Sequence, residues 1–255
     1  MIRFVPIENM TDRPEELLEF DTTPQRTPAW FARRKAKVSG SRLSQLLFCK
    51  TEEEVNTYRR ILQGLEKAEP LDAEALRRCQ WGTIHEADCI HTLLENCPDM
   101  EVFEVGFELH RTQAWMGSSP DGIVRWPSRT PLLGVLECKC CTKLNKAGKT
   151  QPYSQVPYYY LPQVYWEMRC TGLSYAVFVC WGELETIAWH IPFDRSMWLA
   201  IYELVTSFMA GDLPYSSWTR EVRQFCMYAR AACNGFEKIG SWPSVHLCSS
   251  SHATE

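Results

Sequence analysis

Two short stretches of the chain decide its fold: Ser119–Gly122, which reads S-P-D-G, and Leu136–Cys140, which reads L-E-C-K-C. Asp121 of the first stretch stands between a proline and a glycine, whereas Glu137 and Lys139 of the second lie inside an otherwise apolar run. Successive side chains of a strand point to opposite faces, so Glu137 and Lys139 project from the same face. If the intervening chain follows a hairpin-like path, it returns Glu137 beside Asp121. The sequence therefore predicts two carboxylates and one ammonium at one end of a sheet.

This group of charges needs a partner, because carboxylates and an ammonium are costly to remove from water without compensation. A divalent cation would relieve the repulsion between the carboxylates, and the oxygens of Asp and Glu suit Mg²⁺ or Mn²⁺. Lys139 could then position or deprotonate a water, or neutralise charge that develops on a phosphate. The alternative interpretation is a salt bridge within the sheet, with Asp121 as an ordinary turn residue.

A third carboxylate, Glu86, lies on the apolar face of the helical pattern that runs from Asp72 to Asn96. A glutamate that faces a core needs a cation. The cation is either a metal ion or an arginine such as Arg111 or Arg125, and the sequence leaves both open.

Two groups of basic residues indicate contact with an anion. Arg33, Arg34, Lys35, Lys37 and Arg42 lie within ten residues, next to a candidate helix N-terminus at Ser41. Lys143, Lys146 and Lys149 follow in a loop that could track a phosphate backbone. The alternatives are a solvated charged face for the first group and an ordinary flexible lysine loop for the second.

The remaining patterns predict an α/β domain in which helices flank one mixed sheet. Helical spacing and capping residues predict helices at 29–48 (in two pieces), 51–65, 72–96, 153–170, 194–209 and 216–232. Alternating or continuous apolar runs predict strands at 101–110, 114–117, 123–126, 132–141, 174–181 and 186–192. The first 28 residues are expected to form an irregular arm with a short helix near 15–20.

The composition is typical of a soluble globular protein, with 255 residues of which 45% are hydrophobic. The net charge of −4 excludes a generic polycation but allows a nucleic-acid enzyme with a local basic channel. No apolar run approaches the roughly 18 residues that span a bilayer, and no signal peptide is visible. We therefore expect an intracellular, non-exported protein without a membrane partner.

The twelve cysteines fall below the roughly 8–10% that marks a disulfide scaffold, so most are expected to be reduced and buried. Cys138, Cys140 and Cys141 lack the spacing of a zinc site, which is not favoured. The loose spacing of Cys226, Cys233 and Cys248 likewise does not favour an iron–sulfur cluster.

Six motifs in order carry a family resemblance. Besides S-P-D-G and L-E-C-K-C, they are A-W-F-A-R-R (Ala29–Arg34), V-S-G-S (Val38–Ser41), W-G-T-I-H-E (Trp81–Glu86) and Y-L-P-Q-V (Tyr160–Val164). Together they resemble the phage lambda exonuclease and YqaJ-type viral recombinase family of PD-(D/E)xK nucleases, to which the herpesvirus alkaline nucleases are more distantly related. The resemblance covers about residues 29–210. It implies a restriction-endonuclease-like core with a mixed central sheet flanked by helices.

The resemblance also implies roles for individual residues. Asp121 and Glu137 match the metal-binding carboxylates, with the backbone carbonyl of Cys138 completing the site, and Lys139 matches the catalytic lysine. Glu86 matches a carboxylate near a second metal position, and Gln163 a glutamine near the attacking water. Arg34 and Ser41 match residues that hold the 5′-phosphate of a DNA end. The wider set of expected DNA contacts comprises Arg33, Arg34, Lys37, Ser41, Ser119, Lys143 and Lys146.

The function implied is a deoxyribonuclease that uses one or two Mg²⁺ or Mn²⁺ ions to degrade linear double-stranded DNA from the 5′ end, in recombination or DNA-end processing. The implied partners are DNA ends, a single-strand annealing protein and other copies of the chain in a ring trimer. The expected division is an arm (1–28), a nuclease domain (29–212) and a C-terminal helical extension with a polar tail (213–255). The chain departs from the family at Tyr165, where a second glutamine is frequent, and at Cys140–Cys141, where a proline is common.

Three alternatives stay open. The same site could belong to an endonuclease or to an RNA-directed nuclease. The fold could serve as a non-catalytic module that binds nucleic acid or protein. Lastly, the chain could be an unrelated metal-free protein in which Glu86 pairs with an arginine.

Overall fold

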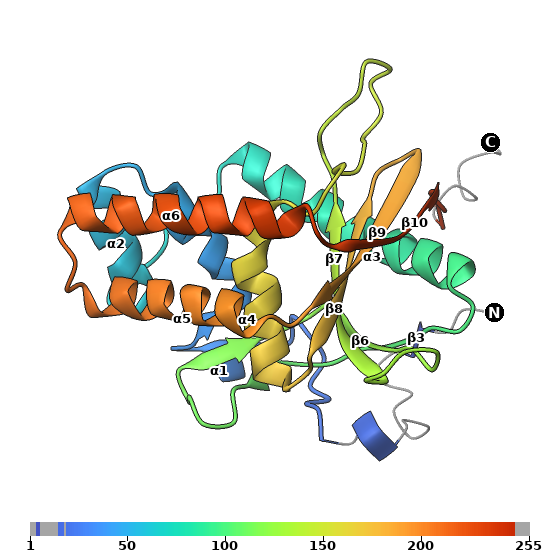
Figure 1. Cartoon of the computed structure of the whole chain (residues 1–255), viewed down its shortest axis with the longest axis horizontal. Coiled ribbons are helices and arrows are strands. Elements are labelled where there is room, and N and C mark those ends of the chain that lie inside the picture. The colour runs from blue at the N-terminus through green and yellow to red at the C-terminus, as the bar shows by residue number, and fades with distance from the viewer. Residues whose placement is uncertain (1–3, 6–14, 18, 248–255) are drawn as a thin grey trace.

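The structure of the protein is a computed structural model, which describes residues 4–5, 15–17 and 19–247 (Figure 1). Its centre is a seven-stranded mixed sheet. In spatial order, the strands are β1 (Phe4–Val5), β3 (Glu101–Phe103), β6 (Gly122–Arg125), β7 (Leu133–Cys140), β8 (Tyr175–Trp181), β9 (Glu185–Pro192) and β10 (Glu237–Pro243). The pairs β1–β3 and β7–β8 are parallel and the other pairs are antiparallel. The predicted mixed α/β architecture is confirmed.

A smaller three-stranded sheet lies beside the main one, in the order β2 (Val38–Ser39), β5 (Met116–Ser118) and β4 (Glu108–Leu109). The helices are α1 (Pro28–Arg34), α2 (Glu52–Leu62), α3 (Ala73–Asn96), α4 (Leu161–Thr171), α5 (Arg195–Ala210) and α6 (Tyr215–Cys233). Short 3₁₀ helices cover Glu15–Leu17 (η2), Gly40–Phe48 (η3) and Tyr158–Tyr160 (η4). Within the described residues, no helix is long and apolar enough to cross a lipid bilayer.

The local signals explain where several helices begin. The side chains of Thr51, Asp72 and Asp194 each accept a hydrogen bond from a backbone N–H of the first helical turn, at α2, α3 and α5 respectively. Each of these caps satisfies a donor that the helix itself leaves without a partner.

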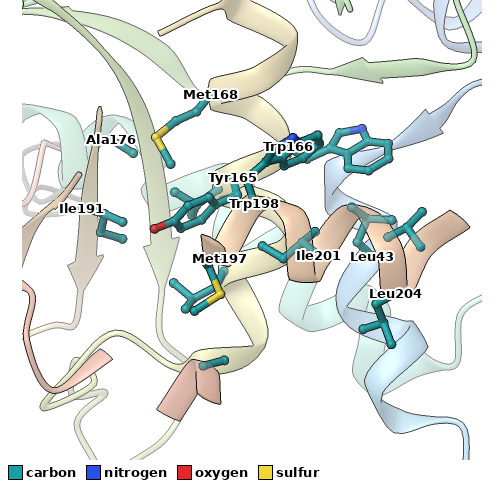
Figure 2. Packing of buried hydrophobic residues seen from close by; sticks show 14 of the residues in the cluster. Leu43, Tyr165, Trp166, Met168, Ala176, Ile191, Met197, Trp198, Ile201 and Leu204 are labelled. Atoms are coloured by element: carbon teal, nitrogen blue, oxygen red, sulfur yellow. The ribbon is translucent and has the colours of Figure 1, made fainter. Parts of the chain in front are cut away.

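Alternation along β7 and β8 divides the core between the two faces of the main sheet. Leu136 and Cys138 pack with Val177 and Val179 in a cluster that includes the apolar side of α3. The opposite face of β8 packs against α4, α5, η3 and α6 in a larger cluster. Figure 1 shows α3 on one side of the sheet and α4, α5 and α6 on the other. Figure 2 shows the larger cluster around Tyr165, Trp166 and Trp198, where α4 meets α5.

The predicted single strand over 101–110 is wrong, because the chain there divides into β3 and β4, which belong to different sheets. Between them, the backbone N–H groups of Gly106 and Phe107 bond to the carbonyl oxygen and the carboxylate of Asp21. A Cβ at position 106 would lie 2.2 Å from Asp21 Oδ2, so the close approach requires glycine. The apolar alternation continues between the strands because Val105 and Phe107 of the connection are also buried.

Two further differences concern α4 and β10. The helix predicted over 153–170 begins only at Leu161, after η4, and Pro162 occupies its first turn, where no backbone N–H is required. Strand β10 was not predicted. It lies in the segment expected to be a C-terminal extension, and it pairs with β9 at the edge of the main sheet. The polar tail at 249–255 lies outside the described residues.

Candidate active site

The turn between β6 and β7 brings the first carboxylate to the second. Gly122 pairs with Leu136, so Asp121 lies directly before the start of β6 and beside the middle of β7. The Asp121 backbone N–H donates to the Leu136 carbonyl at 3.1 Å, and Asp121 Oδ2 accepts from the Cys138 backbone N–H at 2.7 Å. The glycine of S-P-D-G is needed here, because a Cβ at Gly122 would lie 2.9 Å from Val102 Cγ1. The predicted hairpin-like return is confirmed.

Glu137 is the most buried charge of the group, with 1% of its surface exposed. Its Oε1 accepts hydrogen bonds from Lys139 Nζ and from Gln163 Nε2, the latter at 2.7 Å. Its Oε2 is buried and has no hydrogen-bond partner among the described residues. The protein thus satisfies one oxygen of this carboxylate and leaves the other open.

Electrostatics confirm that these groups act on one another. Burial, together with the charges of Glu137 and Glu86, raises the pKa of Asp121 well above its ordinary 3.8. Burial is also the main cause of the raised pKa of Glu86, to which Glu137 contributes. For Lys139, burial would lower the pKa, but the carboxylates of Glu137 and Asp121 outweigh it and raise the pKa. Three carboxylates therefore share one region with a lysine that stays protonated.

A cleft of about 740 Å³ opens over these side chains. Its walls come from the N-terminal half of α3, the end of β7, the start of α4 and the loop before α1. The residues discussed below that line it are Arg26, Trp30, Arg34, Ser41, Glu86, Ser119, Asp121, Glu137, Cys138, Lys139 and Gln163.

Glu86 faces this cleft from α3, and its partner is Arg26, with Nη2 3.3 Å from Oε2. The sequence analysis named Arg111 or Arg125 as arginines that could pair with it, and both are wrong. Arg111 pairs with Glu19, and Arg125 pairs with Glu16 of η2 and Glu101 of β3. Glu86 therefore lies at the rim of the cleft rather than in a closed core, with 35% of its side chain exposed.

A second group of side chains forms a polar pocket in the same cleft, defined here as the Arg34 pocket: Trp30, Arg34, Ser41 and Ser119. Arg34 Nη2 donates to Ser41 Oγ at 2.8 Å, and its guanidinium lies 4.8 Å from the centroid of the Trp30 ring. Trp30 Nε1 in turn donates to Ser119 Oγ at 2.7 Å. Burial lowers the pKa of Arg34, which nevertheless stays cationic. This is an arrangement suited to a phosphate.

Other basic residues predicted to contact DNA lie outside this cleft lining. Arg33 pairs with Asp21 at 3.2 Å, and Lys37 Nζ donates to the Ala114 carbonyl at 2.5 Å. Lys143 and Lys146 are exposed on the loop that follows β7. The structure therefore gathers Arg34, Ser41 and Ser119 at the cleft, and the other four are not part of its lining.

The donor set suits a hard divalent cation. Among the described residues, no three His, Cys, Asp or Glu side chains form a ready-made cluster for a metal ion. Two carboxylates, Asp121 and Glu137, do meet next to the backbone of Cys138, and Glu137 Oε2 is a buried oxygen that lacks a donor. Oxygen ligands of this kind, with waters completing the shell, are what Mg²⁺ and Mn²⁺ take.

Two residues of the site were missed by sequence reasoning. Arg26 stands in the loop before α1 with a left-handed backbone (φ 65°), and nothing in its local sequence indicates a contact with α3. Glu167 is buried on α4 and accepts a hydrogen bond from Gln163. Its spacing of four residues from Gln163 placed it on the same helix face and could have revealed it.

Comparisons with known proteins agree with this geometry. The chain matches the model of the YqaJ-like viral recombinase domain over residues 29–174. It is similar to the crystal structure of the alkaline exonuclease LHK-Exo from Laribacter hongkongensis, with 26% identity, a TM-score of 0.52, and coverage of 80% of this chain and 99% of that one. The structure of LHK-Exo in complex with dAMP matches at 26% identity and a TM-score of 0.51, with the same coverage. No curated protein matches.

The matched region spans more than half of the chain and contains the β6–β7 turn, Lys139 and Gln163. The mixed sheet with helices on both faces is the PD-(D/E)xK core that the motifs predicted. Taken together, these observations show that the chain belongs to the family of YqaJ-like viral recombinase domains.

Proposed function

We propose that this protein is a metal-dependent deoxyribonuclease that degrades linear double-stranded DNA from its 5′ end, in recombination or DNA-end processing. The observation that carries the proposal is the meeting of Asp121, Glu137, Lys139 and Gln163 in one cleft with the Arg34 pocket. The family and the similarity to an alkaline exonuclease support a nuclease role.

Asp121, Glu137 and the carbonyl of Cys138 would hold a Mg²⁺ or Mn²⁺ ion, with Glu86 facing the position of a second. Such an ion would lower the pKa of a bound water and offset negative charge on the phosphodiester. Arg26 neutralises Glu86 in this structure, so Glu86 would have to exchange that arginine for an ion.

Lys139 acts through its charge. In the metal-free protein, the neighbouring carboxylates raise the pKa of Lys139 and so favour its charged form. A fixed ammonium next to the scissile phosphate stabilises charge that develops as the bond breaks. Gln163 contributes a polar side chain at the same position, held against Glu137.

The Arg34 pocket would hold the terminal 5′-phosphate. The guanidinium of Arg34 and the hydroxyls of Ser41 and Ser119 offer several donors to one phosphate. Binding of dAMP by LHK-Exo shows that this related enzyme accepts a deoxynucleoside monophosphate. A pocket for a terminal phosphate would place the first phosphodiester bond over the carboxylates and would make cleavage dependent on a free end.

The test uses three substrates: linear 5′-phosphorylated duplex DNA, closed circular duplex DNA and single-stranded RNA, each with Mg²⁺, with Mn²⁺ or with EDTA. We expect only the linear duplex to disappear, and only with metal. Lys139→Ala should be inactive, whereas Lys238→Ala, which removes an exposed lysine of β10 outside the cleft lining, should be fully active. Cleavage of circles or RNA would redefine the substrate, and cleavage by Lys139→Ala would overturn the site.

Family membership also leads us to propose a ring of three subunits around DNA and a single-strand annealing protein as partner. Light scattering of the purified chain tests the first, with a trimer mass of three times 29.5 kDa as the expected result. Co-purification with an annealing protein encoded nearby tests the second.

A further inference from the structure

Helix α4 carries a second buried carboxyl group, Glu167, which the proposed mechanism does not use. Its exposed fraction is 1%, and burial together with the charge of Glu137 raises its pKa well above the ordinary 4.5. Its Oε2 has no hydrogen-bond partner among the described residues. A buried carboxyl group with an unsatisfied oxygen lowers stability, so its presence next to a functional cleft calls for a physical reason.

The other oxygen of Glu167 contacts Gln163. Gln163 Nε2 donates to Glu167 Oε1 at 2.9 Å and to Glu137 Oε1 at 2.7 Å. Where Glu137 Oε1 and Glu167 Oε1 both accept, the NH₂ group of the amide must face them, because the amide oxygen has no proton to donate. The two hydrogen bonds together therefore determine which way the amide of Gln163 faces.

This orientation leaves the amide oxygen of Gln163 as an available acceptor. No described residue donates a hydrogen bond to Gln163 Oε1, and that atom is not among the buried unsatisfied ones. Gln163 also lines the cleft that contains Asp121 and Lys139. A water in the cleft would therefore find an acceptor of fixed orientation.

Packing of α4 fixes the backbone of Gln163, so only its side chain depends on hydrogen bonds for its orientation. Tyr165, Trp166 and Met168 of α4 are buried in the core shown in Figure 2. Gly40 of η3 lies against the carbonyl of Gln163, where a Cβ would come within 3.1 Å. The three side-chain torsions of a glutamine would otherwise remain free, and fixing them has an entropic cost that hydrogen bonds must offset.

We propose that Glu167 is a positioning residue: it orients the amide of Gln163 so that the amide oxygen faces the attacking water, while the same amide nitrogen steadies the metal-binding carboxylate of Glu137. The role rests on the proposed nuclease function. It deepens that function by connecting two side chains of α4, Glu167 and Gln163, to Glu137 on β7.

The test compares three single variants of the whole protein. Glu167→Gln keeps an oxygen acceptor at the same place, Glu167→Leu removes it, and Thr171→Val is the matched control. Thr171 is buried on the same helix, and its hydroxyl bonds to backbone groups: it donates to the carbonyls of Glu167 and Met168 and accepts from the N–H of Leu173. Each variant is assayed for kcat and KM on linear duplex DNA and for its melting temperature.

We expect Glu167→Leu to lose about 10- to 100-fold in kcat with KM within twofold, the range seen when a supporting residue around a metal site is removed. Glu167→Gln should stay within about threefold of wild type. Thr171→Val should melt at a lower temperature with kcat unchanged. Equal losses in Glu167→Gln and Glu167→Leu, or a loss that follows melting temperature across all three variants, would overturn the positioning role.

A second readout needs neither metal nor DNA. In the wild-type protein, ¹H–¹⁵N spectra should show both amide protons of Gln163 shifted by hydrogen bonding, assigned by their absence in Gln163→Leu. One proton should lose that shift in Glu167→Leu and keep it in Glu167→Gln. Unchanged amide signals in Glu167→Leu would overturn the role of Glu167 alone, whereas absence of DNA cleavage by the wild-type protein would overturn the proposed function and the catalytic part of this role with it.

Discussion

Two buried carboxylates of this protein, Asp88 on α3 and Glu137 on β7, differ in how many of their oxygens have hydrogen-bond partners. They are similarly inaccessible, with 2% and 1% of their surfaces exposed. Both oxygens of Asp88 have partners: Oδ2 bonds to His85 Nδ1 and Oδ1 accepts from the backbone N–H of Leu247, each at 2.7 Å. Glu137 has partners for Oε1 only. The fold satisfies both oxygens of Asp88 and leaves one oxygen of Glu137 without a partner at a cleft, as expected if Asp88 serves stability and Glu137 the proposed chemistry.

The side chains that pair with these two carboxylates also differ, because His85 is packed away from the cleft and Lys139 faces it. His85, next to Glu86 in sequence, stacks on Trp181 at 4.5 Å and pairs with Asp88, which turns it away from a role at the cleft. Lys139, next to the buried thiol of Cys138, faces Glu137 and the cleft instead. Loss of the interactions around Asp88 should therefore lower the free energy of unfolding, whereas loss of those around Glu137 should lower kcat.

The largest effect is expected at Lys139. Lys139→Met removes the ammonium but keeps the length of the side chain, and it should reduce kcat about 10²- to 10³-fold, since charge stabilisation of this kind is worth that much. The measurement is single-turnover cleavage of linear duplex DNA with Mg²⁺, with urea unfolding as a check that the variant is folded. Cleavage within tenfold of wild type would remove Lys139 from the mechanism.

Asp88→Ala should produce the converse result. It leaves His85 and the backbone N–H of Leu247 without their acceptor, which should lower the free energy of unfolding by about 2–3 kcal/mol. Because Asp88 lies outside the cleft lining, kcat of the folded fraction should not change. Urea unfolding and single-turnover kinetics on the same sample decide this. A loss of kcat without loss of stability would erase the distinction between the two carboxylates.

Metal and pH should separate the carboxylates further. Mn²⁺ at ten times its dissociation constant should stabilise the wild-type protein by about 1.4 kcal/mol in thermal unfolding, and Asp121→Asn should abolish this stabilisation.

Because the fold raises the pKa of Asp121 above its unfolded value, the folded state binds more protons than the unfolded state above about pH 4. In EDTA, stability should therefore fall as pH rises through that window, less steeply in Asp121→Asn. Stabilisation by metal should increase over the same range, since the ion needs ionised ligands.

The smallest effect is expected at the Arg34 pocket. Arg34→Ala should reduce the preference for 5′-phosphorylated over 5′-hydroxyl duplex ends about tenfold, equivalent to about 1.4 kcal/mol of binding. Arg33→Ala is the matched control, since that neighbouring guanidinium pairs with Asp21. Competition between the two kinds of DNA end gives the ratio directly. Equal changes in both variants would show that Arg34 contributes only general charge.

Much of the centre of the molecule could be predicted from sequence because its signals are local. Period-two alternation around Glu137 and Lys139 predicted their common face, and a hairpin-like path through 123–131 predicted their return to Asp121. The helix predicted at 72–96 followed from the helical spacing of its residues, and the structure shows that Asp72 caps it. These features depend on neighbours a few residues away.

The features that escaped prediction depend on contacts between distant parts of the chain. The pairing of Arg26 with Glu86 joins residues 60 positions apart. The division of 101–110 into two strands depends on Asp21, whose carboxylate and carbonyl intervene between them. Strand β10 has a mostly exposed, irregular pattern and exists because β9 offers it an edge. No local periodicity contains such information.

The bond between Asp88 and the backbone of Leu247 also has a consequence for biosynthesis. The two residues are 159 positions apart in the chain. At about 5–20 residues per second, the ribosome supplies Leu247 roughly 8–30 s after Asp88. During that interval the strands and the helix that carry Asp121, Glu137 and Gln163 are synthesised, while α3 still lacks its bond to Leu247. In a nascent chain, the wall that bears Glu86 therefore gains this contact only after those residues of the cleft have been made.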